Sequence, residues 1–162
     1  MSMTDGPRGA ATALPFFVYG TLRPGASCHD AYLRAGTAHD EPGTLPGAAL
    51  YDGPGYPYAV EVPGPGRIQG ELVTALDSDY PGLLVSLDEL EEYHGPGDPG
   101  NEYERVIRDV HRADGSTTPA WVYLAAPSVA DGLRRDGTRL AGSDWLAHTA
   151  LTGEQPEPTG AA

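Results

Sequence analysis

Several classes of protein require residues that this sequence lacks. It has one cysteine, Cys28, which excludes an intrachain disulfide and a cysteine-based metal site. A nucleophilic Cys28 would need a nearby base, and the adjacent His29 is poorly placed to act as one. The five histidines show no HExxH-like spacing, and neither a GxSxG elbow nor a P-loop is present. We therefore expect no metal ion and no cofactor.

Basic residues and long apolar segments are also scarce. The 10 Lys and Arg residues face 23 Asp and Glu residues, which gives a formal net charge of -13. The arginines are scattered, whereas binding to nucleic acid or to an anionic membrane needs clustered cations. No stretch approaches the roughly 18 apolar residues of a membrane span, and the N-terminus does not resemble a signal peptide. We predict a cytoplasmic protein that binds neither nucleic acid nor membrane; the sequence leaves its oligomeric state open.

Glycine and proline, in contrast, are abundant. The chain has 22 glycines and 16 prolines among 162 residues, and 40% of its residues are hydrophobic. This composition favours many turns and short strands over long helices, and the length suits one domain with a single core. We expect that domain to span residues 14–151. The polar tails, residues 1–13 and 152–162, have little to bury and are expected to be disordered.

Apolar patterning and turn signals predict more strands than helices. We expect strands at residues 16–19, 48–51, 103–112 and 120–125, and a hairpin formed by residues 58–62 and 68–76. We expect helices at 27–36 and 79–93, and a last one at 129–133 or near Trp145. No repeated βαβ pattern occurs. The order of elements predicts an α+β fold, in which a mixed, mostly antiparallel sheet curls into a small barrel flanked by helices.

The stretch 16–25 reads Phe-Phe-Val-Tyr-Gly-Thr-Leu-Arg-Pro-Gly. Four apolar residues in succession indicate a strand buried on both faces, and the glycine that follows indicates a tight turn. Gly20 has no Cβ, so backbone N–H groups at this turn can approach a ligand closely. The stretch is therefore a candidate binding loop.

The predicted helix 79–93 carries the clearest chemical signal. Its buried arc is formed by four leucines, Leu83, Leu84, Leu87 and Leu90. At about 100° per residue, Glu91 falls about 40° from Leu87 and lies inside this arc, whereas the neighbouring acids 88, 89 and 92 face the flank or solvent. Burial among leucines disfavours the charged form of a carboxylate, which suits a general acid or base. Glu91 is also near the helix end, where it could instead reach water or pair with Arg105.

Motifs in a fixed order resemble the gamma-glutamylcyclotransferase-like family. They are residues 18–23 (Val-Tyr-Gly-Thr-Leu-Arg), Gly47, 50–51 (Leu-Tyr), 56–57 (Tyr-Pro), 70–72 (Gly-Glu-Leu), 87–91 (Leu-Asp-Glu-Leu-Glu), Tyr103-x-Arg105, 120–123 (Ala-Trp-Val-Tyr) and 142–145 (Gly-Ser-Asp-Trp). The last differs from the family's Gly-Asp-Trp by an inserted serine. Each motif is modest alone, but the ordered set is specific and covers residues 16–145.

The resemblance implies a small mixed β-barrel flanked by helices and an enzyme without a cofactor. It implies that Glu91 is the catalytic acid and base. The predicted substrate-binding residues are Tyr19, Gly20, Thr21, Leu22, Arg23, Tyr56 and Tyr123, of which the first four form the loop that holds a gamma-glutamyl group. The expected reaction releases 5-oxoproline and a free amine from a small gamma-glutamyl amine or amino acid. The alternative is a protein of the same fold that binds a small molecule without catalysis.

The sequence departs from the family pattern at two places. Glu91 is followed by Glu92, where many relatives have glycine directly after the acid. The loop at residues 95–101 is also long and rich in glycine and proline. Neither the leaving group nor the fit of the substrate beyond its glutamyl part is predicted by the sequence.

Overall fold

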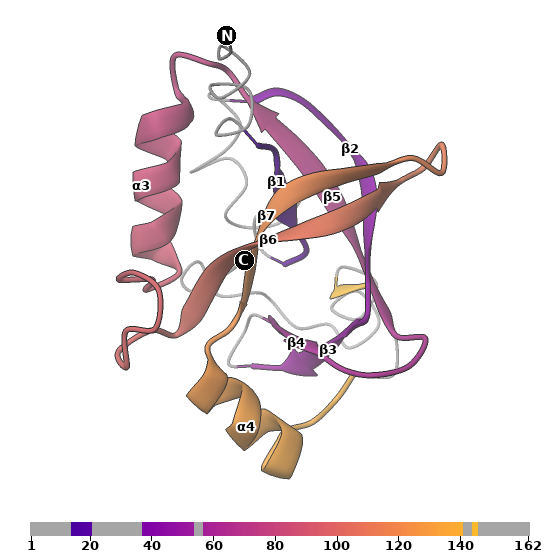
Figure 1. Ribbon diagram of the computed structural model, residues 1–162, viewed down its shortest axis with the longest axis vertical. Coiled ribbons are helices and arrows are strands. Elements are labelled where there is room, and N and C mark those ends of the chain that lie inside the picture. The colour runs from indigo at the N-terminus through magenta and orange to yellow at the C-terminus, as the bar shows by residue number, and fades with distance from the viewer. Residues whose placement is uncertain (1–13, 21–36, 54–56, 141–143, 146–162) are drawn as a thin grey trace, which may run out of the picture.

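The computed structural model describes residues 14–20, 37–53, 57–140 and 144–145, and these form a closed barrel, a second sheet and two helices (Figure 1). In spatial order the barrel strands are β1 (Phe16–Val18), β5 (Arg67–Ala75), β2 (Thr37–Pro46), β6 (Tyr103–Arg112) and β7 (Thr117–Ala125). The second sheet pairs β3 (Ala48–Asp52) with β4 (Pro57–Glu61). The helices are α3 (Tyr80–Leu90) and α4 (Pro127–Asp136). The structure confirms the predicted α+β barrel with flanking helices.

Strand β1 closes the barrel. It pairs antiparallel with β5 and parallel with β7, where Phe16 lies opposite Trp121. All three residues of β1 and the following Tyr19 are buried, as expected for a strand covered on both faces. The barrel is therefore mixed, with one parallel pairing among antiparallel ones.

The predicted hairpin of residues 58–62 and 68–76 is wrong. The first segment, β4, pairs with β3, while the second, β5, pairs with β1 and β2. Strand β2, which lies between β5 and β6 in the barrel, is absent from the sequence-based prediction because Pro42 and Gly43 interrupt its alternation. Gly43 is nevertheless suited to its place, since a Cβ there would come within 3.2 Å of side chains from β5 and β6.

The two helices agree with the predictions in position but not in length. Helix α3 begins at Tyr80, with Asp79 at its N-cap and Pro81 in its first turn, and ends at Leu90 rather than Tyr93. Among the described residues, the Asp79 side chain makes no capping hydrogen bond. Helix α4 contains the predicted segment 129–133, whereas the predicted helix 27–36 and most of the alternative near Trp145 lie outside the described residues.

The helices and the small sheet cover different parts of the barrel (Figure 1). Helix α3 runs along one side, and the β3–β4 sheet and α4 lie beyond one end. Neither α3 nor α4, the helices of the described part, has the length and apolar character that a membrane crossing requires. The C-terminal end of α3 thus lies near the side of the barrel that β6 and β7 form, and this is where the candidate site is found.

Candidate active site

The end of α3 fixes the position of Glu91. Glu91 is the C-cap residue, and its backbone N–H donates to the Leu87 oxygen at 2.9 Å. Glu92 then adopts a left-handed conformation with φ of 54°, and its N–H and that of Tyr93 donate to the oxygens of Glu89 and Asp88. These two bonds form a Schellman motif, in which glycine is the usual left-handed residue. The turn stops the helix directly after Glu91.

The Glu91 side chain is fully buried, with 0% of its surface exposed. Leu87, one turn earlier, is also 0% exposed, whereas Glu89 and Glu92 are exposed and Asp88 is half-buried. The prediction that one acid of this segment points inward is therefore confirmed. Burying a carboxylate is costly without compensating interactions, so its place in the core is unusual for a residue of this type.

Two tyrosines that are far apart in the sequence lie within range of the Glu91 charge. Burial raises the pKa of the Tyr19 phenol well above its usual range, and the negative charge of Glu91 raises it further, while a hydrogen bond with the Ala59 backbone opposes the shift. Burial likewise raises the pKa of Tyr123, with contributions from its hydrogen bond to Asp88 and from the charges of Asp88 and Glu91. Both phenols therefore remain protonated across the physiological range and feel the charge of Glu91.

The tyrosines are joined to each other and to α3. The Tyr19 hydroxyl donates to the backbone oxygen of Tyr123 at 2.6 Å, and the Tyr123 hydroxyl donates to Asp88 Oδ1 at 2.6 Å. Asp88 and Glu91 are three residues apart, so they lie one turn apart on neighbouring parts of the helix surface. These two bonds link the residue that follows β1 to β7, and β7 to α3.

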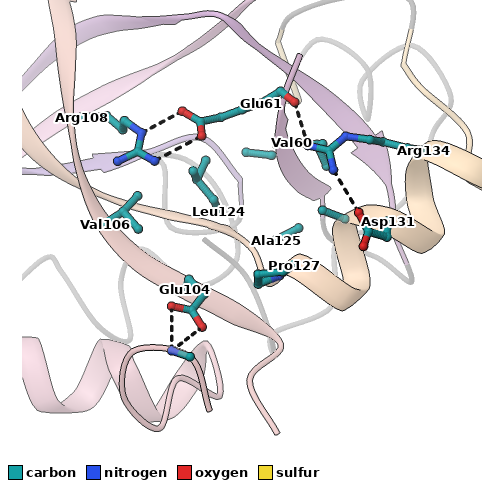
Figure 2. Close-up of a pocket in the computed structure, with 13 residues that line it drawn as sticks. Val60, Glu61, Glu104, Val106, Arg108, Leu124, Ala125, Pro127, Asp131 and Arg134 are labelled. Atoms are coloured by element: carbon teal, nitrogen blue, oxygen red, sulfur yellow. Dashed lines mark hydrogen bonds and ion pairs between the residues drawn. The ribbon is translucent and has the colours of Figure 1, made fainter. Parts of the chain in front are cut away.

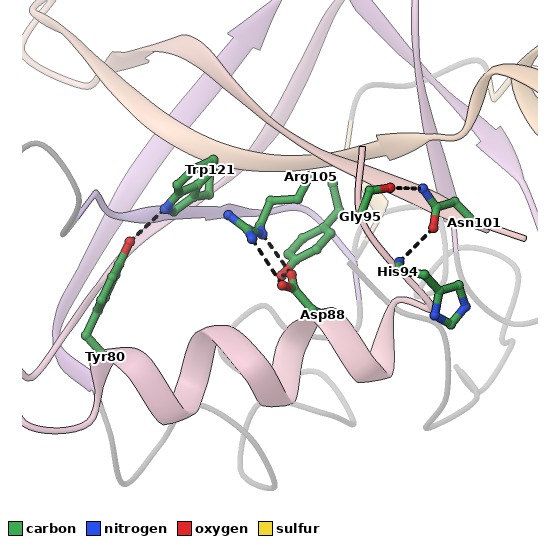
Figure 3. A network of polar contacts seen from close by, with 8 residues as sticks. Tyr80, Asp88, His94, Gly95, Asn101, Arg105 and Trp121 are labelled. Carbon is green, nitrogen blue, oxygen red and sulfur yellow. Dashed lines mark hydrogen bonds and ion pairs between the residues drawn. The ribbon is translucent and has the colours of Figure 1, made fainter. Parts of the chain in front are cut away.

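Asp88 is also held by Arg105 on β6 (Figure 3). Arg105 Nε donates to Asp88 Oδ1 at 2.8 Å and Nη2 donates to Oδ2 at 3.1 Å, which is a bidentate pair. The guanidinium lies over the rings of Trp121, at 4.3 Å, and Tyr93, at 5.3 Å. Trp121 is fixed in turn by a 2.7 Å hydrogen bond from its Nε1 to the Tyr80 hydroxyl. Arg105, considered from sequence as a partner of Glu91, thus forms its ion pair with Asp88.

The loop that follows α3 is ordered by Asn101, which is 4% exposed. Its Nδ2 donates to the oxygen of Gly95 at 2.8 Å, and its Oδ1 accepts from the N–H of His94 at 2.7 Å (Figure 3). Nδ2 also donates to Glu104 Oε2 at 2.8 Å. Segment 95–101 is a loop, as predicted, and these bonds join its two ends to each other and to Glu104 of β6.

Of the predicted site residues, the structure places Glu91, Tyr19, Gly20 and Tyr123 in one region. Gly20 is buried directly after Tyr19. The other predicted binding residues, Thr21, Leu22, Arg23 and Tyr56, lie outside the described residues. Tyr19 lies within range of the Glu91 charge, and the pairing of the whole loop with this acid stays a prediction.

A separate pocket of about 370 Å³ lies between β4, the β6–β7 strands and α4 (Figure 2). Its floor includes Val60, Leu124 and Ala130, and Glu91 is not among its lining residues. On its rim Arg108 pairs with Glu61 at 2.7 Å. Successive residues of a strand point to opposite faces, so Leu124 faces this pocket while Tyr123 faces Asp88. The pocket is thus across β7 from Glu91.

The contacts of Asp88 were not predicted, although the sequence spacing of the residues involved gave part of the information. The spacing of Asp88 and Glu91 places them one helical turn apart, and Trp121 and Tyr123 share one face of a strand. The register of β6 on β7, in which Arg105 lies opposite Tyr123, was the missing information. Within the described residues, no group of three or more His, Cys, Asp or Glu side chains is placed to hold a metal ion.

Comparison with known proteins gives a consistent family assignment. Residues 16–147 match the family model described as gamma-glutamyl cyclotransferase, AIG2-like. A curated relative, the gamma-L-glutamyl-butirosin B gamma-glutamyl cyclotransferase of Niallia circulans, is 33% identical over 109 residues. That match covers 67% of this chain and 64% of the relative, so the chain spans less than two thirds of that protein.

Solved structures show the same fold. An AIG2-like protein from Mus musculus superimposes with a TM-score of 0.64 at 22% identity, covering 90% of this chain and 95% of that one. YkqA from Bacillus subtilis gives a TM-score of 0.62 at 20% identity, covering 86% of this chain and 42% of that one. The family model, which spans most of the sequence and contains both the loop at Gly20 and the acid at Glu91, decides the assignment. The chain belongs to the gamma-glutamyl cyclotransferase, AIG2-like family.

Proposed function

We propose that this protein is a gamma-glutamyl cyclotransferase that releases 5-oxoproline and a free amine from a small gamma-glutamyl amine or amino acid. One observation carries the proposal: a fully buried carboxylate, Glu91, lies at the end of α3 beside the phenols of Tyr19 and Tyr123. Family membership and the cyclotransferase activity for which the Niallia circulans relative is named support the same reaction.

Glu91 is the general base and acid of the proposed reaction. Its carboxylate takes a proton from the α-ammonium of the substrate, and the freed amine attacks the γ-carbonyl carbon of the same glutamyl unit. The five-membered lactam forms as the bond from that carbon to the leaving nitrogen breaks. Protonated Glu91 returns its proton to the departing nitrogen. The attacking nitrogen then loses a second proton, which the released amine takes up to leave as an ammonium, so Glu91 ends the cycle as the carboxylate with which it began.

Position supplies much of the acceleration in such a reaction. Because nucleophile and carbonyl belong to one molecule, holding the substrate in a folded shape lowers the entropic part of the barrier. Backbone N–H groups of the stretch that begins at Gly20, which the resemblance assigns to the glutamyl group, would stabilise the oxyanion. The residues named here need no redox or group-carrying cofactor for this proton transfer and ring closure.

The proposal is tested by incubating the protein with a panel of gamma-glutamyl amines and gamma-glutamyl amino acids and measuring 5-oxoproline. We expect at least one member to react, and Glu91→Gln to lower kcat by about 100-fold or more because the amide cannot transfer the proton. Glu89→Gln is the matched control, since this exposed acid lies two residues away on the outer face of α3.

Two outcomes would contradict the proposal. Full turnover by a folded Glu91→Gln variant would remove Glu91 from the mechanism. Binding of panel members without any 5-oxoproline would identify a protein that recognises the gamma-glutamyl group without transforming it.

The cytoplasmic location expected from the sequence also stays a prediction.

A further inference from the structure

The hydrogen-bond donor of Tyr123 is already used within the protein. A phenol has one O–H donor and can accept through its oxygen lone pairs. In this structure the donor is directed at Asp88 Oδ1, at 2.6 Å. Because the phenol also keeps its proton, its oxygen can interact with a further partner only as an acceptor.

The direction of this bond is imposed by Asp88. A carboxylate accepts hydrogen bonds and donates none, so Tyr123 must be the donor of the pair. Asp88 itself cannot turn away easily, because Arg105 holds both of its oxygens at 2.8 and 3.1 Å. Burial lowers the pKa of Arg105, but its hydrogen bond and charge interaction with Asp88 outweigh this and raise it, so the guanidinium stays charged.

The aromatic residues around Arg105 keep the pair in one arrangement. The guanidinium is 4.3 Å from the centre of the Trp121 ring, and the Trp121 Nε1 is bonded to Tyr80 at 2.7 Å. A cation over an aromatic face is attracted by the ring and loses freedom to rotate away. The chain Tyr80–Trp121–Arg105–Asp88 therefore ends by orienting the Tyr123 hydroxyl.

We propose that Asp88 is a positioning residue that fixes the Tyr123 oxygen as a hydrogen-bond acceptor for the α-ammonium of the substrate. The Tyr123 oxygen and the Glu91 carboxylate then present two acceptors to one cation that has three donors. Glu91 removes one proton, and Tyr123 holds the amine by another N–H while it attacks. This inference rests on the proposed function for the identity of the substrate, but its recognition step is measurable without turnover.

The test compares two ligands that lack the γ-carbonyl and cannot cyclise. S-butyl-L-homocysteine carries the α-ammonium and the α-carboxylate, and 4-(butylthio)butanoate lacks only the amino group. Calorimetry gives the ratio of their dissociation constants, which reports recognition of the ammonium. In the native protein we expect a preference of about tenfold or more for the amine-bearing ligand, as for one hydrogen bond to a charged group.

Three variants locate the source of this preference. Tyr123→Phe removes one oxygen, and we expect the ratio to fall about tenfold. Asp88→Ala removes the acceptor of the Tyr123 hydroxyl and frees its proton to point at the ammonium, so a similar fall is expected. The double variant should lose no more than Tyr123→Phe alone, since Asp88 acts through Tyr123. Glu89→Gln, on the exposed face of α3, should leave the ratio unchanged.

The outcomes separate the inference from the proposed function. An unchanged ratio in folded Tyr123→Phe, a ratio near one in the native protein, or losses that multiply in the double variant would each overturn the positioning role. If Asp88→Ala does not fold, Tyr123→Phe decides alone, because it leaves the Asp88–Arg105 pair in place. The 5-oxoproline assay on the native protein tests the reaction independently, so the ratio can change as expected even where no product forms.

Discussion

The Tyr19 hydroxyl donates a 2.6 Å hydrogen bond to the backbone oxygen of Tyr123, a residue 104 positions later in the chain. This bond joins the end of β1 to β7 at the point where the barrel closes. Both phenols lie under the influence of the Glu91 charge. This hydrogen bond therefore helps to close the barrel and also holds two tyrosines of the candidate site together.

The two phenols predict a loss of stability in alkali. Burial, with the Glu91 charge, raises the pKa of Tyr19 and Tyr123 above the unfolded value of 10.0. Their stabilising contribution is complete below pH 10 and falls as the pH rises, by about 1.4 kcal/mol per pH unit for each group that stays protonated in the native state. Urea unfolding between pH 9 and 11 measures this slope.

Two variants test whether these tyrosines cause the fall in the free energy of unfolding at alkaline pH. Tyr19→Phe and Tyr123→Phe should each make the decline with pH less steep. In an ultraviolet difference titration of the folded protein, neither substitution should change the number of tyrosines that ionise near pH 10. A fall in that number would show that the substituted phenol titrates normally, contrary to the prediction.

The left-handed residue after Glu91 predicts a stabilising substitution. Glu92 has φ of 54°, a conformation that costs a residue with a Cβ about 1 kcal/mol and costs glycine little. We expect Glu92→Gly to raise the free energy of unfolding by about 1 kcal/mol, measured by urea denaturation. Glu89→Gly is the matched control: it places glycine inside α3 and should lower stability by a similar amount. Equal effects of the two changes would contradict the helix end described here.

Gly70 on β5 predicts a substitution that the fold does not tolerate. A Cβ at this position would lie 2.3 Å from the backbone oxygen of Val18 and 2.8 Å from the Phe17 ring. Because β1 is held between two strands and cannot retreat, Gly70→Ala should lower the free energy of unfolding by at least about 2 kcal/mol.

Gly82 in α3 provides the comparison for Gly70. Among the described residues, no heavy atom outside its own helix and chain neighbours lies within 4 Å of a Cβ built there. Gly82→Ala should therefore stabilise the protein by about 0.4 to 1 kcal/mol through the unfolded chain. Thermal and urea unfolding of both variants check the contrast, and a stable Gly70→Ala variant would be inconsistent with the close packing of β1 on β5.

The hydrogen bonds of Asn101 are expected to stabilise the loop after α3. Truncating its side chain to alanine removes three partly buried hydrogen bonds, to the His94 N–H, the Gly95 oxygen and Glu104. We expect Asn101→Ala to cost about 1–3 kcal/mol in free energy of unfolding and to speed amide exchange at residues 94–101. Asp98→Ala, which removes an exposed bond to the Gly100 N–H, should change stability by no more than about 0.5 kcal/mol. Equal losses in both variants would argue against the central role of Asn101.

The sequence by itself determined those features that depend on local pattern. An uninterrupted apolar run indicated the buried strand β1, and turn residues bounded β3 and β6 closely. Helical periodicity placed Glu91 among leucines, and the structure confirms its burial. The ordered motifs indicated the family and its barrel. All of these follow from the spacing of residues within one element or from their order along the chain.

The tertiary structure alone decided which elements meet. It paired β4 with β3 instead of β5, inserted β2 into the barrel, and gave Arg105 to Asp88. It also brought Tyr19 to Tyr123, a contact that no local pattern encodes. Strand alternation specifies which face is buried but not which neighbour lies alongside, and closure of the barrel fixes every pairing at once. The residues around Glu91 are therefore set by the closed barrel. The inward direction of the Glu91 side chain, in contrast, follows from the helical periodicity of the sequence.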